Sequence, residues 1–151
     1  MESRISSTEW PSVVVPRAVQ RLLDHFFSLM DTMTDEAGSK LTTDIFTSDA
    51  TFISSSGTFK GSLEIKQSRA KAWEHVTSRY HEIVKVYSAT EDGSDLLMIG
   101  NAVLVLKNGK KVQGDFLGRA RIERINTPDP RMSFFQAWGD TGPMIKAMQE
   151  S

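Results

Sequence analysis

The order of the expected elements constrains this chain more than any other feature. Before Arg79 the apolar side chains mostly recur at steps of three and four, whereas residues 79–140 alternate with a period of two. Four long strands are expected there, joined by short links: residues 80–89, 96–106, 111–125 and 131–138. Strands linked in this way form an antiparallel meander. We therefore expect an α+β fold, in which a cone-shaped, curved antiparallel sheet wraps around N-terminal helices and encloses a pocket.

The helices are expected in the first half of the chain. Pro16 suits a first helical turn, and the residues that follow it carry one apolar stripe to about Thr32. A second, short helix is expected at residues 39–46, after a break at residues 35–38. A third, at residues 62–75, is apolar on two sides, which is typical of a helix between two layers.

Size and composition narrow the class of protein. A chain of 151 residues suits one domain, and we expect a flexible arm at residues 1–12 and a single domain at residues 13–151. The net charge of −1, without a long run of like charges, argues against a nucleic-acid partner. The chain has no cysteine and no stretch of membrane-span length, and its start lacks a long apolar run, so we expect a cytoplasmic protein without a membrane partner. The three histidines lack the spacing of metal ligands, so no metal is expected.

The third expected strand, residues 111–125, has an informative register. Alternation places Gly114 and Gly118 on its apolar face together with Val112, Phe116, Ala120 and Ile122. Glycines there reduce side-chain bulk and let the sheet bend. Two interpretations stay open: the glycines leave room for a ligand, or they only permit packing of the helix that carries Phe26.

Several local strings, taken in order, resemble the nuclear transport factor 2-like superfamily, in particular its SnoaL-like and scytalone-dehydratase-like branches. The resemblance covers about residues 16–140. It rests on two expected helices, the long first one and the sandwiched one. It also rests on three strings: residues 46–52 (Phe-Thr-Ser-Asp-Ala-Thr-Phe), residues 57–61, which begin and end with glycine, and the closing Trp138-Gly139-Asp140. The resemblance implies an α+β cone with a deep pocket.

It also implies a function. Proteins of these branches include isomerases, cyclases and dehydratases that need no metal or organic cofactor. We therefore expect acid–base catalysis on a hydrophobic secondary-metabolite intermediate, such as a polyketide, terpenoid or alkaloid. The alternative is a non-catalytic small-molecule-binding or dimerisation module of the same fold.

His81 is the leading catalytic candidate, because it opens the first long strand where scytalone dehydratase has a similar pocket histidine. A neutral imidazole can move a proton near neutral pH. The alternative is a partly exposed strand histidine.

Three carboxylates could act as its partner. Asp140 matches the aspartate that ends the last strand in relatives, but it could instead cap the C-terminal tail. Asp31 lies at the end of the first helix, where this fold often carries a pocket acid, yet a helical wheel places it off the apolar stripe and favours a solvated carboxylate. Asp115 is expected on the outer face unless a bulge turns it inward, and Gly118 occupies the position of the SnoaL-like catalytic aspartate.

Polar and aromatic side chains are the candidates for substrate binding. Asn101 and Tyr80 could orient a carbonyl or a hydroxyl, although Asn101 could instead face solvent. The aromatic candidates, which could equally be core residues, are Trp73, Phe52, Phe116 and Trp138. A homodimer could form through the outer sheet face, where Arg119, Arg121 and Glu123 alternate beside Leu117.

Overall fold

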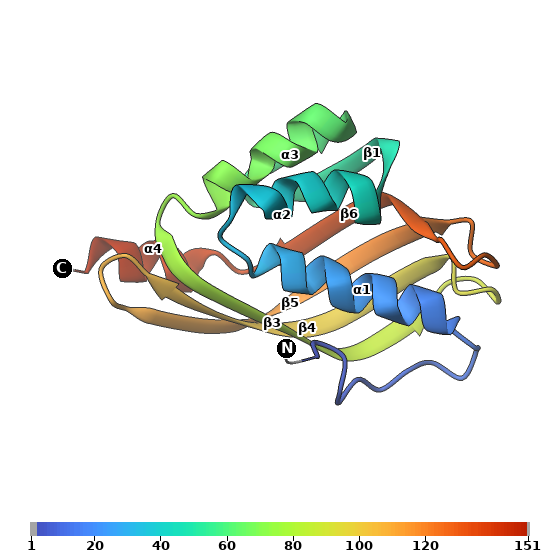
Figure 1. Cartoon of the computed structure of the whole chain (residues 1–151). Helices are drawn as coiled ribbons and strands as arrows, with labels where there is room; N and C mark the ends of the chain where they lie inside the picture. The colour runs from blue at the N-terminus through green and yellow to red at the C-terminus, as the bar shows by residue number, and fades with distance from the viewer. Residues whose placement is uncertain (1–2, 151) are drawn as a thin grey trace.

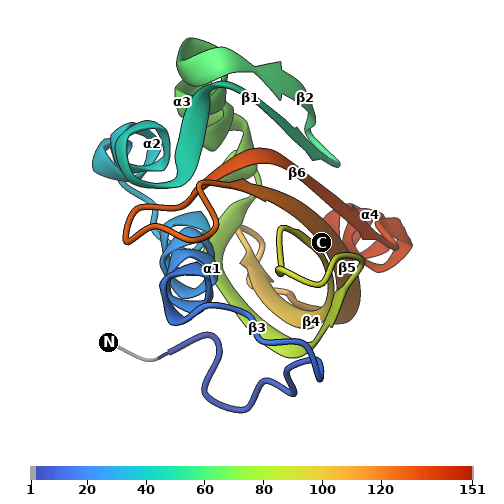
Figure 2. The ribbon, with the colours of Figure 1, turned by 90° about the vertical axis from the view of Figure 1, so that its right-hand side faces the viewer.

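A six-stranded, strongly curved sheet wraps around the first helix in the computed structural model, which describes residues 3–150 (Figures 1 and 2). The helices are α1 (Arg17–Met30), α2 (Asp35–Lys40), the π-helix η1 (Leu41–Ile45), α3 (Gly61–Ala72) and α4 (Gly142–Gln149). The strands are β1 (Phe46–Ser54), β2 (Gly57–Lys60), β3 (Val76–Ser88), β4 (Asp95–Leu106), β5 (Lys111–Glu123) and β6 (Arg131–Gly139). The expected α+β cone, with helices inside a curved sheet, is confirmed.

The sheet is mixed rather than wholly antiparallel. Its order is β2-β1-β6-β5-β4-β3, and the pairing of β1 with β6 is parallel. Consecutive strands joined by short turns must run antiparallel, which explains the meander from β3 to β6. β1 and β6 are instead separated by about half of the chain, residues 55–130, so no turn dictates their relative direction. The expectation of an antiparallel sheet was therefore wrong for this one pair.

The second helix begins earlier than expected. α2 already starts at Asp35, with acidic residues in its first turn, and continues directly into η1. Gly38, which contributed to the expected break, instead allows close helix packing, since a Cβ at this position would lie 2.8 Å from the backbone oxygen of Lys66 in α3. The glycine marks a contact between helices and not the end of one.

The core lies between α1 and the concave face of the sheet. The apolar stripe of α1 is buried there, as expected. Phe26 is fully buried and contacts Phe135 of β6 at a ring-centroid distance of 4.6 Å, with Phe46 and Phe52 of β1 at 5.8 and 6.2 Å. This aromatic cluster fixes α1 against the middle of the sheet.

Residues 3–12, which we expected to form a flexible arm, are held along β3. Backbone hydrogen bonds join Ile83 N–H to the Arg4 carbonyl (2.9 Å), Glu9 N–H to the Val84 carbonyl (2.9 Å) and Val86 N–H to the Glu9 carbonyl (3.0 Å). Arg4 is buried, and Ile5 and Trp10 pack against the core. The segment therefore covers the edge strand of the sheet.

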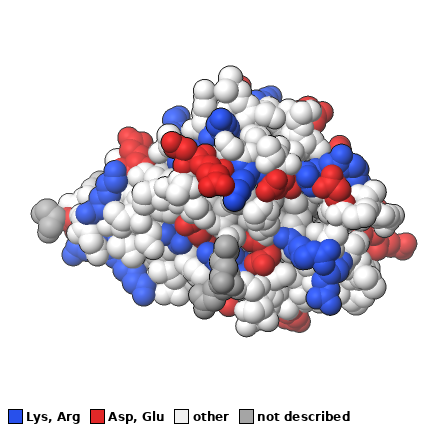
Figure 3. All heavy atoms as spheres, viewed as in Figure 1, with Lys and Arg blue, Asp and Glu red and all other residues white. Residues whose placement is uncertain are grey.

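The surface is of mixed charge. Basic and acidic side chains are interspersed over the face in Figure 3, without a single-sign patch. Among the helices of residues 3–150, none is both long and apolar enough to cross a membrane.

Candidate active site

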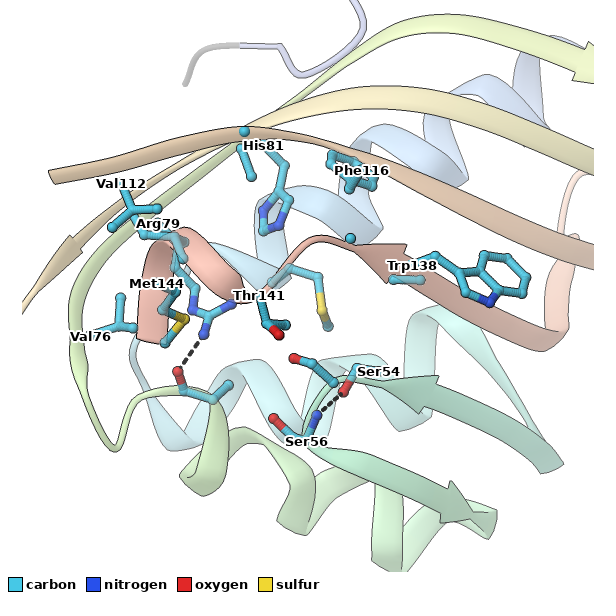
Figure 4. A pocket seen from close by; sticks show the side chains of 18 of the residues that line it. Ser54, Ser56, Val76, Arg79, His81, Val112, Phe116, Trp138, Thr141 and Met144 are labelled. Carbon is cyan, nitrogen blue, oxygen red and sulfur yellow. Dashed lines mark hydrogen bonds between the residues drawn. The ribbon is translucent and has the colours of Figure 1, made fainter. Parts of the chain in front are cut away.

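A cavity of about 490 Å³ opens beyond the last turn of α1, between the concave faces of β3 to β6, the end of α3 and the start of α4 (Figure 4). Phe27 and Met30 line it from α1, Arg69 and Ala72 from α3, and the remaining wall comes mainly from the sheet. This volume lies in the range of small-molecule sites. The expected pocket is present.

His81 of β3 projects into this cavity (Figure 4). Its ring lies between two phenylalanines, with centroid distances of 5.6 Å to Phe27 and 5.4 Å to Phe116. The side chain is only 15% exposed. An imidazole thus stands in a largely apolar pocket, where its proton-transfer partners are limited to what the pocket supplies.

Asp31, immediately after α1, holds this imidazole in place. Its Oδ1 lies 2.5 Å from His81 Nδ1, while its Oδ2 accepts the His81 backbone N–H at 2.9 Å. An ionised carboxylate only accepts hydrogen bonds, so Nδ1 carries the proton and Nε2 is left as the basic nitrogen. The two residues form a His–Asp pair with a fixed tautomer.

Arg4 completes the surroundings of Asp31. Its Nε donates to Asp31 Oδ2 at 3.0 Å, and the Asp31 side chain is 2% exposed. The interpretation of Asp31 as a solvated carboxylate was therefore wrong. The helical wheel does not apply to Asp31, which is the C-terminal cap of α1 with its own backbone angles, and the N-terminal segment folds over it.

Two arginines also face the cavity interior. Arg69 of α3 is buried and donates from Nη2 to the Met30 carbonyl (2.9 Å), whereas Arg79 of β3 donates from Nη2 to the Ala72 carbonyl (2.6 Å). Burial lowers the pKa of Arg69 to about 10, helped by the positive charge of Arg79 and opposed by Asp31. A lowering from 12.5 to about 10 corresponds to roughly 3 kcal/mol of unfavourable burial of the charged form. Burial likewise lowers the pKa of Arg79.

The other candidate carboxylates are at the rim. Asp140 lines the cavity but is exposed, and its Oδ1 accepts the Gly142 backbone N–H at 2.9 Å, which is the tail-capping arrangement. Asp115 is exposed, and its Oδ1 accepts a hydrogen bond from Asn101 Nδ2 at 3.2 Å. The register of β5 has no bulge there, so the Asp115 carboxylate lies on the outer face with Asn101, as alternation predicts, although the residue also borders the cavity at its rim. Neither carboxylate joins the His81–Asp31 pair.

The expected substrate-binding residues divide into two groups. Phe52, Phe116 and Trp138 line the cavity, with Trp138 at its exposed rim. Within residues 3–150 the lining does not include Asn101, Tyr80 or Trp73. Asn101 bonds Asp115 on the outer face, the ring of Tyr80 lies 4.4 Å from the Arg4 guanidinium carbon, and Trp73 lies under Arg79 at 5.5 Å. The alternation of β3 and β4 explains the outward direction of Tyr80 and Asn101.

The two β5 glycines have different surroundings, and room for a ligand at Gly114 stays a prediction. A Cβ at Gly114 would have no heavy atom within 4 Å and would face open cavity. A Cβ at Gly118 would lie 3.0 Å from Phe135 Cζ and 3.2 Å from Met98 Cγ, so this glycine permits core packing.

Three residues of this site were missed by the sequence analysis: Arg4, Arg69 and Arg79. Two of them had a usable signal. Arg79 lies two residues before His81 on one strand and must share its face, and Arg69 interrupts the helix face formed by Ile65 and Ala72. Arg4 had none, since its contact depends on the docking of the N-terminal segment. No group of three or more metal-ligating side chains occurs within the described part of the chain.

Comparison with known proteins supports the fold alone. No protein-family model matches the chain, and no curated protein matches its sequence. Solved structures do match. One is a hypothetical protein with a ketosteroid isomerase-like fold from Catenulispora acidiphila DSM 44928, in complex with trimethylamine, at 14% identity and a TM-score of 0.67, covering 88% of this chain and 92% of that one. TerC co-crystallised with polyporic acid matches at 11% identity and a TM-score of 0.69, covering 88% and 99%.

A third neighbour is a hexachlorocyclohexane dehydrochlorinase, LinA type 2, at 16% identity and a TM-score of 0.65, covering 82% of this chain and 83% of that one. The chain therefore has the fold of nuclear transport factor 2-like and ketosteroid isomerase-like proteins. This fold includes enzymes and proteins of unknown function alike.

Proposed function

We propose that this protein is an acid–base enzyme of the SnoaL-like or scytalone-dehydratase-like kind, acting as an isomerase, cyclase or dehydratase on a hydrophobic small molecule. The His81–Asp31 pair carries the proposal, because a partly buried imidazole that lines a cavity and has a fixed tautomer is the arrangement of a general base. A binding module of this fold would have no need for such a pair.

The proposed chemistry follows from the geometry. His81 Nε2 takes a proton from a carbon or a hydroxyl of the substrate, and the Asp31 carboxylate stabilises the imidazolium that forms. The same nitrogen then returns the proton, to another substrate atom in an isomerisation or to a leaving hydroxyl in a dehydration. Phe27 and Phe116 exclude water from the imidazole, which strengthens its polar contacts. No step requires a cofactor.

The substrate class rests on the cavity lining and on the neighbours. Aromatic and aliphatic side chains of α1 and of the sheet form most of the inner wall, which suits a hydrophobic secondary-metabolite intermediate. Two neighbours support this choice of class, since one was co-crystallised with polyporic acid and another is named a dehydrochlorinase.

We also propose a homodimer that forms through the outer sheet face, where the exposed Leu97 and Leu117 support such a contact.

The test uses 5-nitrobenzisoxazole, a generic probe for a positioned base. A base removes its ring C–H proton, the N–O bond breaks, and a coloured nitrile-bearing nitrophenolate forms. His81→Asn should lower kcat/KM for this reaction about 100-fold or more, the usual contribution of general-base catalysis. Asp31→Asn should lower kcat more than it raises KM, because it misorients the imidazole without removing it.

His25→Asn is the matched control. His25 also pairs with an aspartate, Asp44, at 3.0 Å, but both side chains are 43% exposed and lie outside the cavity. The kcat/KM of His25→Asn should equal that of the wild type. Equal rates for wild type, His81→Asn and His25→Asn would contradict the enzyme and favour the binding module.

A further inference from the structure

The two arginines of the cavity have many more hydrogen-bond donors than the protein satisfies. Each guanidinium has five N–H donors. Within residues 3–150 the structure gives each of them one acceptor, a backbone carbonyl, and the Nε atoms of both Arg69 and Arg79 are buried without any partner. Buried polar groups are otherwise paired in native proteins. The buried Nε atoms are out of reach of the cavity, but both side chains line it, so their terminal Nη donors point to a molecule that the cavity receives from outside.

The charges point in the same direction. Arg4, Arg69 and Arg79 all lie close to Asp31, which is the buried carboxylate of this region and is already bonded to Arg4 and His81. The remaining acidic residues of the lining, Glu74, Asp115 and Asp140, are exposed at the rim. The cavity interior therefore has an excess of positive charge. An acceptor without donors of its own, such as an anion, would balance it.

The position of the arginines relative to His81 defines the ligand further. Arg79 and His81 are two residues apart on β3, so both point into the cavity with Cα atoms roughly 6.5 Å apart along the strand (Figure 4). An anionic group on Arg79 would leave the adjoining part of the same molecule beside the imidazole. The walls there are apolar, formed by Phe27, Phe116 and the open face of Gly114.

We propose that Arg69 and Arg79 form an anion-binding subsite for the carboxylate of a hydrophobic, aromatic small molecule, whose ring system lies against Phe116 and the open face of Gly114. The placement of that ring system next to a reacting His81 rests on the proposed function. The anion subsite itself does not, since it involves neither His81 nor Asp31 directly. The proposal narrows the substrate class from hydrophobic molecules in general to hydrophobic carboxylic acids.

The experiment compares two probes of the same shape by isothermal titration calorimetry, 2-naphthoate and the neutral 2-naphthamide. The wild-type protein should bind the carboxylate about 10- to 100-fold more tightly, as expected for charge-assisted hydrogen bonds. Arg79→Met should remove most of this preference, because it weakens binding of 2-naphthoate much more than binding of 2-naphthamide. The comparison of the two probes on the wild type tests the carboxylate preference without any variant. It therefore remains a test of the anion subsite even if Arg79→Met or Arg69→Met fails to fold.

Lys71→Met is the control for general charge, because Lys71 also lines the cavity but is exposed at its rim. It should change the affinity for 2-naphthoate less than about threefold. Equal affinities of the wild type for the two probes, or equal losses in Lys71→Met and Arg79→Met, would overturn the proposal.

His81→Asn separates this proposal from the proposed function. It should still prefer 2-naphthoate over 2-naphthamide. If the wild type binds 2-naphthoate preferentially but shows no proton-transfer activity, the proposed enzyme is contradicted and the anion subsite is not. If the wild type is active but does not prefer 2-naphthoate over 2-naphthamide, the anion subsite is contradicted and the enzyme is not.

Discussion

The concave face of the sheet has two halves, each with a glycine of β5. One half is packed against α1, and the other borders the cavity. In one half Gly118 lies under Phe135 and Met98, and Phe26 of α1 closes the space. In the other half Gly114, on the same face of the same strand, looks into the cavity. The difference arises from α1, whose last turn lines the cavity and which ends at Met30. The pocket begins where the helix stops, so helix length and not strand sequence decides which half is filled.

The largest effect should come from an aromatic side chain in the filled half. Phe135 is 2% exposed and contacts Phe26, Phe27 and Phe52. Phe135→Ala should lower the free energy of unfolding by about 3–5 kcal/mol, because it leaves a cavity in a packed core. Both residues line the cavity, but Phe116 is only partly buried, so Phe116→Ala should lower the free energy of unfolding by less than half as much. Urea unfolding of both variants checks this, and equal losses would remove the contrast between the halves.

The two glycines allow the same comparison with a single methyl group. Gly118→Ala should be destabilising by about 1–3 kcal/mol, because Phe135 and Met98 are buried and would have to shift by a few tenths of an ångström to accept the new Cβ. Gly114→Ala should change the free energy of unfolding by less than about 0.5 kcal/mol, or raise it slightly.

Gly114→Leu then tests whether the open space beside Gly114 is used to bind a ligand. Its stability should stay near that of the wild type, while its affinity for 2-naphthoate falls about tenfold through lost volume. A destabilised Gly114→Ala would mean that the open half is packed in solution.

The smallest effect concerns the outer face behind the filled half. Arg119 donates to both oxygens of Asp95, at 3.1 and 2.9 Å, and this hydrogen bonding lowers the pKa of Asp95 below 3.8. Because the folded pKa is lowered, the pair stabilises the protein above pH 3.8 and loses its contribution as the pH falls through the folded value. Asp95→Asn should therefore be less stable by under about 1 kcal/mol at pH 7, given the partial exposure of both side chains.

The stability difference between this variant and the wild type should disappear in acid, as followed by urea unfolding at several pH values. Binding of 2-naphthoate at pH 7 should not change. A difference that grows in acid would contradict the assigned role of the pair.

The parts of this contrast that depend on local periodicity could be predicted from the sequence. The alternation of β5 placed Gly114 and Phe116 inward and Asp115 outward, and His81 was expected in the pocket. What failed depends on contacts between distant parts of the chain. Nothing local signals that β1 will pair in parallel with β6, or that Arg4 will reach Asp31 across 27 positions. The basic residues Arg69 and Arg79 were passed over because a charged side chain in a helix or strand is usually solvated.

The docking of residues 3–12 has a consequence for how the site comes into being. The backbone partners of this segment, Ile83, Val84 and Val86, lie some eighty residues further along the chain. The backbone pairing of Arg4 with Ile83 places the Arg4 guanidinium on Asp31, which in turn holds the His81 imidazole. The orientation of the imidazole therefore depends on a pairing between two distant segments, and a substitution that weakens this pairing would also disturb the site.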